Sequence, residues 1–226
     1  MIPLRDDNPS TITPYMSYAV LALCVLVFLW QLSVADPRAA VYAFGVTPAV
    51  LIGPLELPAG IAVVPPVATI FTSMFLHGGL MHLAGNMLYL WIFADNIEDT
   101  MGHARFVAFY LLCGVAAVLA QALPEPSSQV PMIGASGAIS GVLGAYLLLF
   151  PQAHVLVGVP LGFFLHTMRM PAVLVLGLWF ALQLVSSAGD TGEAGVAFRA
   201  HIGGFIAGMV LIPLFAPGRV ALFKRR

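Results

Sequence analysis

Apolar residues occupy six long stretches of this chain, and the segments outside them carry most of the charges. The stretches lie at 15–34, 70–95, 104–123, 133–150, 171–188 and 199–216. Each comes close to the roughly 17–25 residues that a helix needs to cross the hydrocarbon core of a bilayer. The pattern predicts an all-α, polytopic membrane protein with six transmembrane helices.

The composition argues against a soluble domain or a nucleic-acid partner. Of the 226 residues, 60% are hydrophobic and 8% are charged, against roughly a quarter charged in soluble domains. We therefore treat residues 1–226 as a single membrane domain. The net charge of −1 offers no basic face to a nucleic acid. Residues 1–14 lack the features of a signal peptide, so we expect the first span to be retained as an anchor.

The basic residues predict the orientation of the bundle. With six spans, both termini lie on one side of the membrane. Seven basic residues then share that side with the termini, namely Arg5, Arg105, Arg169, Arg219, Lys224, Arg225 and Arg226, and only Arg38 and Arg199 lie on the other side. Basic residues favour the cytoplasmic side, so both termini are predicted to be cytoplasmic. We expect the protein in the cell membrane, which is the inner membrane in a prokaryote.

The connections between the spans differ in character. The segment 35–69 contains six prolines yet remains apolar, so we expect it to lie against the outer interface without a clean amphipathic helix. The segment 151–170 is predicted to be a cytoplasmic connection. The segment 189–198 is polar and rich in glycine, which makes it a candidate for a mobile cap. Cys24 and Cys113 lie in the middle of apolar spans and are expected to be core residues rather than a disulfide.

Polar side chains sit near the beginnings of the even-numbered spans. His82 and Asn86 belong to the second, Ser136 to the fourth and His201 to the sixth. These spans all run from outside to inside, so the four residues are predicted to share one depth near the outer face. Serine beside histidine supplies an alcohol and a base for acyl transfer. Helix packing or interhelical hydrogen bonding would explain each residue alone, but their alignment favours a functional site, as is usual for ionisable groups in a membrane.

Small residues recur on the helices that carry Ser136 and His201. They lie three or four positions apart and comprise Gly134, Gly137, Gly141, Gly144, Ala200, Gly204 and Gly208. Such stripes let two helix backbones approach closely. We expect this approach to bring His201 within hydrogen-bonding distance of Ser136.

Four motifs together resemble the rhomboid family of intramembrane serine proteases. They are His77-x4-His82-x3-Asn86, Glu98-x3-Gly102, Gly134-Ala135-Ser136-Gly137 and Ala200-His201-Ile202-Gly203-Gly204. The resemblance implies a six-helix rhomboid bundle with a water-filled cavity that opens to the outer face. It implies Ser136 as nucleophile, His201 as general base, and an oxyanion hole formed by His82, Asn86 and the Ser136 amide. His77, Glu98, Gly134, Gly137, Gly204 and Gly208 are expected to support this site.

The resemblance also implies substrates and excludes cofactors. The expected substrates are single-span transmembrane proteins, cut in or near the membrane after lateral entry between spans two and five. No cofactor or metal is expected. Two departures from the family pattern concern support: Ala68-Thr69 stands where some members have Trp-Arg, and Ser140 stands where many have an aromatic residue against the histidine. The first loop and His201 are therefore expected to be held in another way.

Two other functions remain open. An inert rhomboid-like protein would bind membrane clients without cutting them, but such relatives usually lack the serine or the histidine. A transporter would use the histidines for protons or a metal. The spacing of five between His77 and His82, with no cysteine or carboxylate nearby, is unfavourable for a zinc site.

Overall fold

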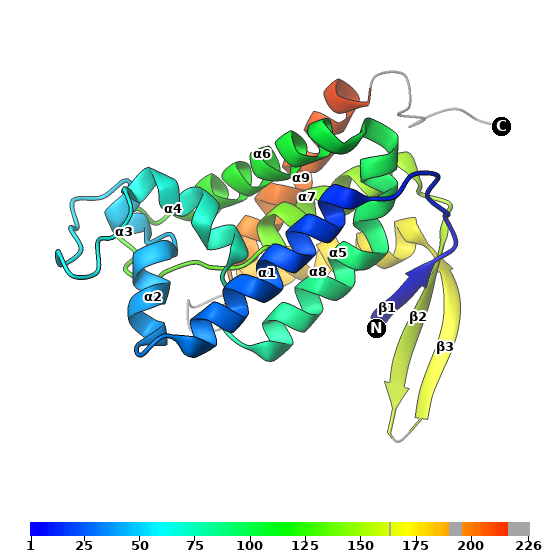
Figure 1. Ribbon diagram of the computed structural model, residues 1–226. Coiled ribbons are helices and arrows are strands. Elements are labelled where there is room, and N and C mark those ends of the chain that lie inside the picture. The colour runs from blue at the N-terminus through cyan, green and yellow to red at the C-terminus, as the bar shows by residue number, and fades with distance from the viewer. Residues whose placement is uncertain (163, 190–195, 217–226) are drawn as a thin grey trace.

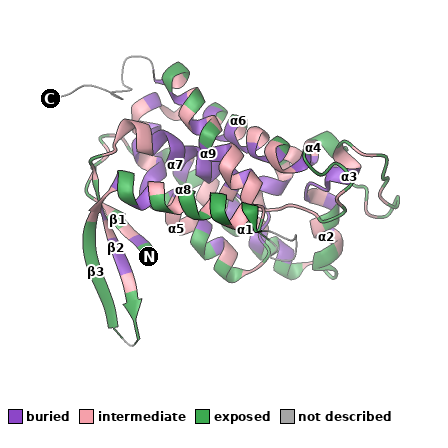
Figure 2. Cartoon of the chain, turned by 180° about the vertical axis from the view of Figure 1, so that it is seen from behind, coloured by how far each residue is buried: buried purple, intermediate pink, exposed green. Residues whose placement is uncertain are grey.

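Six helices form a bundle, and a small antiparallel sheet lies at one end of it (Figure 1). The computed structural model describes residues 1–162, 164–189 and 196–216. The helices of the bundle are α1 (Tyr15–Ser33), α5 (Leu80–Met101), α6 (His103–Ala122), α7 (Ser136–Leu149), α8 (Ala172–Ala188) and α9 (Phe198–Phe215). The most deeply buried helix is α7, with ten consecutive buried residues from Gly137 to Tyr146 (Figure 2).

The helices differ in their ability to span a membrane. Among the described residues, α1, α6 and α9 are long and apolar enough to cross a bilayer. A fourth apolar unit is bent by 80° and consists of α4 (Pro66–Thr72), the 3-10 helix η1 (Ser73–Phe75) and α5. The helices α7 and α8 are apolar but shorter. The chain is mostly helical and suited to a membrane, while the count of six spans and their orientation stay predictions.

The predicted span over 70–95 is broken between Phe75 and Leu80, and a break is expected at Gly78-Gly79 because glycine has a low helix propensity. At the break, the backbone N–H of His77 donates to Oε1 of Gln31 over 2.9 Å, and Nε2 of Gln31 donates to the carbonyl of His77 over 3.3 Å. The buried Gln31 side chain thus replaces the helical hydrogen bonds that His77 lacks. Gly78 and Gly79 follow, and their low helix propensity favours a new start at Leu80.

The prediction of an all-α chain is confirmed only in part, because the chain is mostly helical but three strands form a sheet in the order β1-β2-β3. The strands are β1 (Ile2–Asp6), β2 (His154–Leu161) and β3 (Phe164–Pro171). The register runs from His154 opposite Pro171 to Leu161 opposite Phe164. The segment 151–170 was expected to be a connection only, yet its valines favour a strand. Pairing of β1 with β2 places the first residues of the chain beside the α7–α8 connection.

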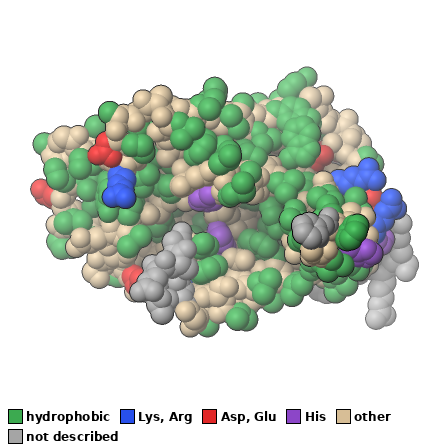
Figure 3. Space-filling view, turned by 90° about the horizontal axis from the view of Figure 1, so that it is seen from below, with side chains coloured by type: hydrophobic (Ala, Val, Ile, Leu, Met, Phe, Trp, Pro, Cys, Tyr) green, Lys and Arg blue, Asp and Glu red, His purple; other side chains and the backbone are tan. Residues whose placement is uncertain are grey.

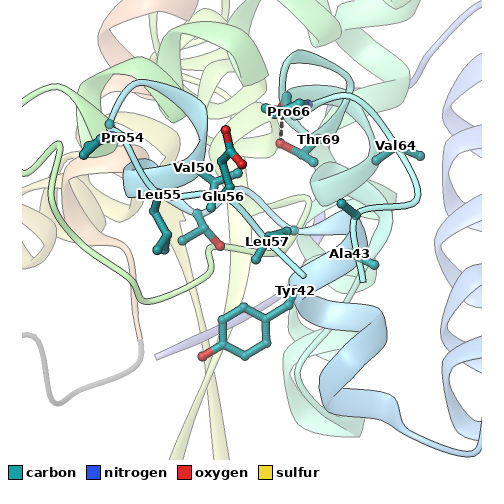
Figure 4. A pocket seen from close by; sticks show the side chains of 14 residues that line it. Tyr42, Ala43, Val50, Pro54, Leu55, Glu56, Leu57, Val64, Pro66 and Thr69 are labelled. Carbon is teal, nitrogen blue, oxygen red and sulfur yellow. Dashed lines mark hydrogen bonds between the residues drawn. The ribbon is translucent and has the colours of Figure 1, made fainter. Parts of the chain in front are cut away.

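The connection after α1 contains helices where no clean helix was expected. They are α2 (Pro37–Phe44), α3 (Pro48–Leu51) and α4, and each has proline in its first turn. Proline fits there because its missing N–H is not needed and its φ is already helical. The prolines therefore start helices in this segment. A cavity of about 480 Å³ lies among these helices and the loop between α3 and α4, and Leu55, Glu56 and Leu57 of that loop are part of its wall (Figure 4).

This connection is anchored without the Trp-Arg pair. The Oγ1 of Thr72 donates to the carbonyl of Phe44 over 2.6 Å, which joins α4 to α2. Val46 and Met132 exchange two backbone hydrogen bonds of 3.0 and 2.7 Å. The connection is thereby tied to the segment that leads into Ser136.

Candidate active site

Ser136 and His201 come together as the sequence predicts. Ser136 is the first residue of α7, and His201 lies in the first turn of α9. The Oγ of Ser136 is 2.8 Å from Nε2 of His201, which is a hydrogen bond. The distance is short because the two helices touch through their backbones. A Cβ on Gly204 would overlap the carbonyl of Gly137 on the facing helix.

The second nitrogen of His201 contacts a residue that the sequence analysis missed. Nδ1 of His201 lies 2.8 Å from Oε1 of Gln183 on α8. Nε2 of Gln183 donates to the carbonyl of Trp179 over 3.4 Å, which turns Oε1 toward the ring. An Nδ1–H that donates to Gln183 leaves Nε2 free to accept the proton of Ser136, and the hydrogen bond of the other nitrogen sets the tautomer in this way.

An aromatic ring covers His201, but it does not come from the position expected in the family. The ring of Trp179 on α8 lies 5.9 Å from that of His201, at 37° between planes. Ser140, at the expected position, instead donates its Oγ to the carbonyl of Ser136 over 2.6 Å. The sequence does contain a signal for this support of His201. Gln183 is the one amide side chain in the apolar stretch 171–188, and Trp179 lies four residues earlier on the same helical face.

His82 lies beside the segment that precedes Ser136. Gly134 has a φ of +126°, and a Cβ there would come within 2.8 Å of both Cε1 and Nε2 of His82 and 3.6 Å of Ser136 Oγ. Nδ1 of His82 accepts the backbone N–H of Gly78 over 3.3 Å. This bond leaves the proton on Nε2, the ring nitrogen nearest to Gly134. Gly134 is the residue that permits the close approach.

Asn86 offers a second donor on α5. Its side chain is buried, and its Nδ2 has no hydrogen-bond partner among the described residues. Asn86 follows His82 by four residues, so the two side chains share a face of the helix. A buried amide without a partner is costly, and such a group is suited to bind a negative oxygen that forms only during a reaction.

His77 and Glu98 lie outside the contact between Ser136 and His201. The Nδ1 of His77 is 3.2 Å from the carbonyl of Phe75, and its ring packs edge-on against that of His82 at 5.2 Å. Glu98 is fully buried, and its carboxylate accepts the backbone N–H groups of Met16 and Ser17 over 2.9 and 2.7 Å. A carboxylate at the start of α1 is favourable because it meets the positive end of the helix dipole. Glu98 is sixteen residues after His82, or about 24 Å along α5.

Histidine side chains are visible in a hollow on one face of the molecule (Figure 3). Ser136, His82 and His201 each remain partly exposed. Of the segment 189–198, which was expected to be a mobile cap, residues 190–195 lie outside the described part of the chain. Within the described ranges, no group of three or more His, Cys, Asp or Glu side chains is arranged to hold a metal ion.

The site therefore brings together a serine hydroxyl, an imidazole and two further polar side chains within an apolar helical bundle. This combination is typical of a membrane protein with a polar site between its helices. Residues 65–218, about two thirds of the chain, match the Rhomboid domain. The chain belongs to the rhomboid family.

Several curated relatives are similar to this chain. Rhomboid protease GluP of Bacillus subtilis is 30% identical over 161 residues, which cover 70% of this chain and 28% of that protein. Rhomboid protein 1, mitochondrial, of Saccharomyces cerevisiae is 32% identical over 153 residues, or 63% and 40% of the two chains. Presenilin-associated rhomboid-like protein, mitochondrial, of Homo sapiens is 30% identical over 153 residues, or 66% and 35%.

The matched segments are thus less than half of each of these three relatives. The relatives include proteins of bacteria and of mitochondria, so family membership places the chain in a membrane, and the cell membrane stays a prediction.

Proposed function

We propose that this protein is an intramembrane serine endopeptidase that cuts membrane-anchored proteins in or near a transmembrane segment. The observation that carries the proposal is the 2.8 Å hydrogen bond between Ser136 Oγ and His201 Nε2 in an apolar helical bundle. Membership of a family with named proteases supports it. A serine with only a structural role would not need a hydrogen bond to a histidine whose Nδ1 is itself hydrogen-bonded, as it is here to Gln183.

In the proposed reaction, Ser136 Oγ attacks the carbonyl carbon of the scissile peptide while His201 Nε2 takes the hydroxyl proton. The protonated His201 then gives this proton to the leaving amine, and the acyl group remains on Ser136. Water next attacks the acyl-enzyme while His201 takes a proton from it, and the bond between the acyl carbon and Ser136 Oγ then breaks. His201 returns its proton to Oγ, which restores the hydroxyl and releases the new carboxyl end. Histidine suits both roles because its charge changes near neutral pH.

The negative oxygen of the tetrahedral intermediate needs hydrogen-bond donors. We assign this role to Nε2–H of His82, Nδ2 of Asn86 and the backbone N–H of Ser136. Ser136 is the first residue of α7, and the first four N–H groups of a helix have no partner inside it. The positive end of the α7 dipole favours the same charge. Donors fixed before the reaction stabilise the transition state without reorganisation.

A neutral partner for the base suits this environment. Gln183 Oε1 can accept from Nδ1–H of His201 and hold the ring, as a carboxylate does in soluble triads. A carboxylate would also stabilise the protonated ring, but its own burial among apolar helices would cost free energy. Gln183 is therefore assigned as a positioning residue.

The substrates are proposed to be single-span membrane proteins. A substrate helix has to unwind locally before its carbonyl can reach Ser136, and its freed backbone groups are hard to satisfy in lipid. Cleavage is therefore expected near small or helix-breaking residues, close to the outer interface. Lateral entry between α5 and α8 is proposed from the family resemblance, and the active site is proposed to open to the outer face of the cell membrane.

A fluorophosphonate probe tests the nucleophile without knowledge of the substrate. We expect the wild-type protein in detergent to be labelled, Ser136→Ala to be unlabelled and His201→Ala to be labelled far more slowly. Unchanged labelling of Ser136→Ala would assign the reaction to another residue. A wild type that is folded but not labelled would favour the alternative of an inert, client-binding rhomboid-like protein.

A further inference from the structure

The hairpin formed by β2 and β3 extends beyond the helices. It leaves the bundle between the end of α7 and the start of α8, and its free end lies clear of the helix ribbons (Figure 1). Every residue of β3 from Phe164 to Arg169 is exposed. The turn end is exposed over both strands, whereas the root of β2 is buried (Figure 2).

One face of the hairpin is apolar along its whole length. Alternate residues of a strand share a face, and so do residues directly opposite each other on paired strands. The register therefore groups the following residues on one face: Val155, Val157, Val159, Leu161, Phe164, His166, Met168 and Met170. His166 is the one polar member, and it has a largely apolar ring.

The root of this face is covered by the protein, but its outer part is not. Val155 and Val157 have no exposed surface and belong to the core cluster of the bundle. Farther along the same face, Leu161 is 59% exposed, Phe164 80% and Met168 42%. The apolar surface that packs on the helices thus continues past their edge. At the edge of the bundle of a membrane protein, the apolar surroundings that could cover this surface are the lipids.

The other face of the hairpin is more polar. It presents Thr167 and Arg169 together with the apolar residues Leu156, Pro160 and Leu165, of which Leu165 is 54% exposed. Arg5 of β1 lies on the same side, because Arg5 and Arg169 both pair with Leu156. An apolar face opposite a face that carries basic residues is found in elements that lie in a membrane interface.

The position of β3 in the sheet limits how deeply the hairpin can enter the membrane. In the sheet order β1-β2-β3, β3 is an edge strand with backbone groups that no strand pairs. Such an edge is not tolerated within the hydrocarbon core, but it can be hydrated among headgroups.

We propose that the outer part of the β2–β3 hairpin is an interfacial membrane anchor. It lies in the headgroup–acyl boundary of the leaflet at the end of the bundle where α1 begins and α7 ends, with Leu161, Phe164 and Met168 toward the acyl chains and Thr167 toward water. This inference depends on the membrane placement of the bundle and not on its proposed proteolytic activity.

Spin labels on the full chain test the anchor. Single cysteines replace Phe164 or Thr167 in a background in which Cys24 and Cys113 are alanine, and each carries a nitroxide. The proteins are placed in nanodiscs of phosphatidylethanolamine and phosphatidylglycerol. Power saturation compares collisions with oxygen, which enriches in lipid, against those with a water-soluble nickel chelate.

We expect the label at 164 to collide mainly with oxygen and the label at 167 to collide mainly with nickel. In detergent-free nanodiscs, the label at 164 should also be broadened by spin-labelled lipids, whereas the label at 167 should not. Equal and high collision with nickel at both positions would overturn the proposal and leave another protein as the cover for this face. Melting midpoints equal to that of the parent show that both labelled proteins keep the fold.

Discussion

At the scale of single residues, His201 contacts a partner on each side of its ring. Ser136 lies at Nε2 and Gln183 at Nδ1, each at 2.8 Å. The ring of Trp179 lies alongside. Both supporting side chains come from α8, so the orientation of the base depends on how α8 packs against α9. The stacked rings of Phe180 and Phe205, 4.4 Å apart, join these two helices near the site.

Replacing Gln183 with methionine keeps its length but removes the acceptor for Nδ1–H. We expect kcat to fall roughly three- to tenfold with KM nearly unchanged, which corresponds to the net worth of one hydrogen bond. Gln183→Glu keeps an oxygen acceptor and should retain more activity. The matched control is Gln121→Met, because Gln121 Oε1 accepts the backbone N–H of Ala200 and does not contact the ring. Equal losses of kcat in Gln183→Met and the control would show a packing role alone.

Asn86 is predicted to act only in the transition state. Loss of one oxyanion donor typically lowers kcat by about 10²–10³-fold, so Asn86→Ala should reduce kcat on this scale without weakening substrate binding. The thermal midpoint should not fall, because Nδ2 of Asn86 makes no hydrogen bond among the described residues. A wild-type kcat for Asn86→Ala, measured on a single-span substrate, would remove Asn86 from the oxyanion hole.

At the scale of elements, α7 and α9 pack backbone to backbone. A Cβ on Gly208 would overlap the carbonyl of Gly141, and one on Gly144 would overlap the carbonyl of Phe205. Hydrogen-bonded helix backbones cannot shift locally to make room as a flexible side chain can. This contact, rather than side-chain interdigitation, sets the distance between Ser136 and His201.

Gly208→Ala should therefore destabilise the bundle and separate Ser136 from His201. Overpacking of a tight core typically costs about 1–3 kcal/mol, and the contact with backbone places this variant at the upper end. Gly177→Ala on α8 is the control, because a Cβ there meets nothing within 4 Å. Thermal unfolding in one detergent should show a clear fall in midpoint for the first and little change for the second. Equal midpoints would contradict the backbone packing.

The first strand joins the bundle through a carboxyl group whose ionisation is unfavourable. Oδ2 of Asp6 accepts a hydrogen bond of 2.5 Å from the hydroxyl of Tyr146. Burial raises the pKa of Asp6 from 3.8 to about 6; the bond from Tyr146 opposes this rise, and the charge of Asp95 adds to it. Because the pKa of Asp6 is higher in the folded state than in the unfolded state, its protonation stabilises the folded state. This stabilisation is fully present below about pH 4 and is lost as the pH rises through about 6.

Asp6→Asn should remove this dependence on pH, because the amide oxygen can still accept from Tyr146 and carries no charge. The difference in melting midpoint, wild type minus variant, should therefore become more negative between about pH 4 and pH 7. A difference that stays constant over this range would show that Asp6 does not titrate in the folded protein with its raised pKa.

The elements also show what the sequence could and could not predict. Ser136, His201, His82 and Asn86 were identified because polar groups are rare in apolar stretches. Their shared depth followed from the common direction of the even-numbered spans, and the approach of His201 to Ser136 followed from the small-residue stripes. The sheet was missed because residues 151–170 were interpreted as a connection, and hydropathy does not reveal the pairing of β2 with the distant β1. Gly78 and Gly79 indicate the break before Leu80, but its hydrogen-bond partner Gln31 lies 46 residues away from His77, and no local pattern reveals it.

At the scale of the whole molecule, the bundle has two different ends. One end contains the sheet with Arg5 and Arg169. The other contains an ion pair of 2.9 Å between Arg199 and Glu125, close in sequence to the first turn of α9. Arg5 and Arg169 are two of the basic residues from which this end is predicted to be cytoplasmic, and under that prediction Ser136 and His201 lie toward the outer face.

The most direct test of the central claim is proteolysis of a single-span membrane protein in liposomes. Purified wild type, Ser136→Ala and His201→Ala are compared at equal concentration, and the fragments are identified by mass spectrometry. We predict a cut in or near the transmembrane segment by the wild type and no cut by either variant. Equal cleavage by Ser136→Ala would contradict the account, because the reaction would then proceed without the proposed nucleophile.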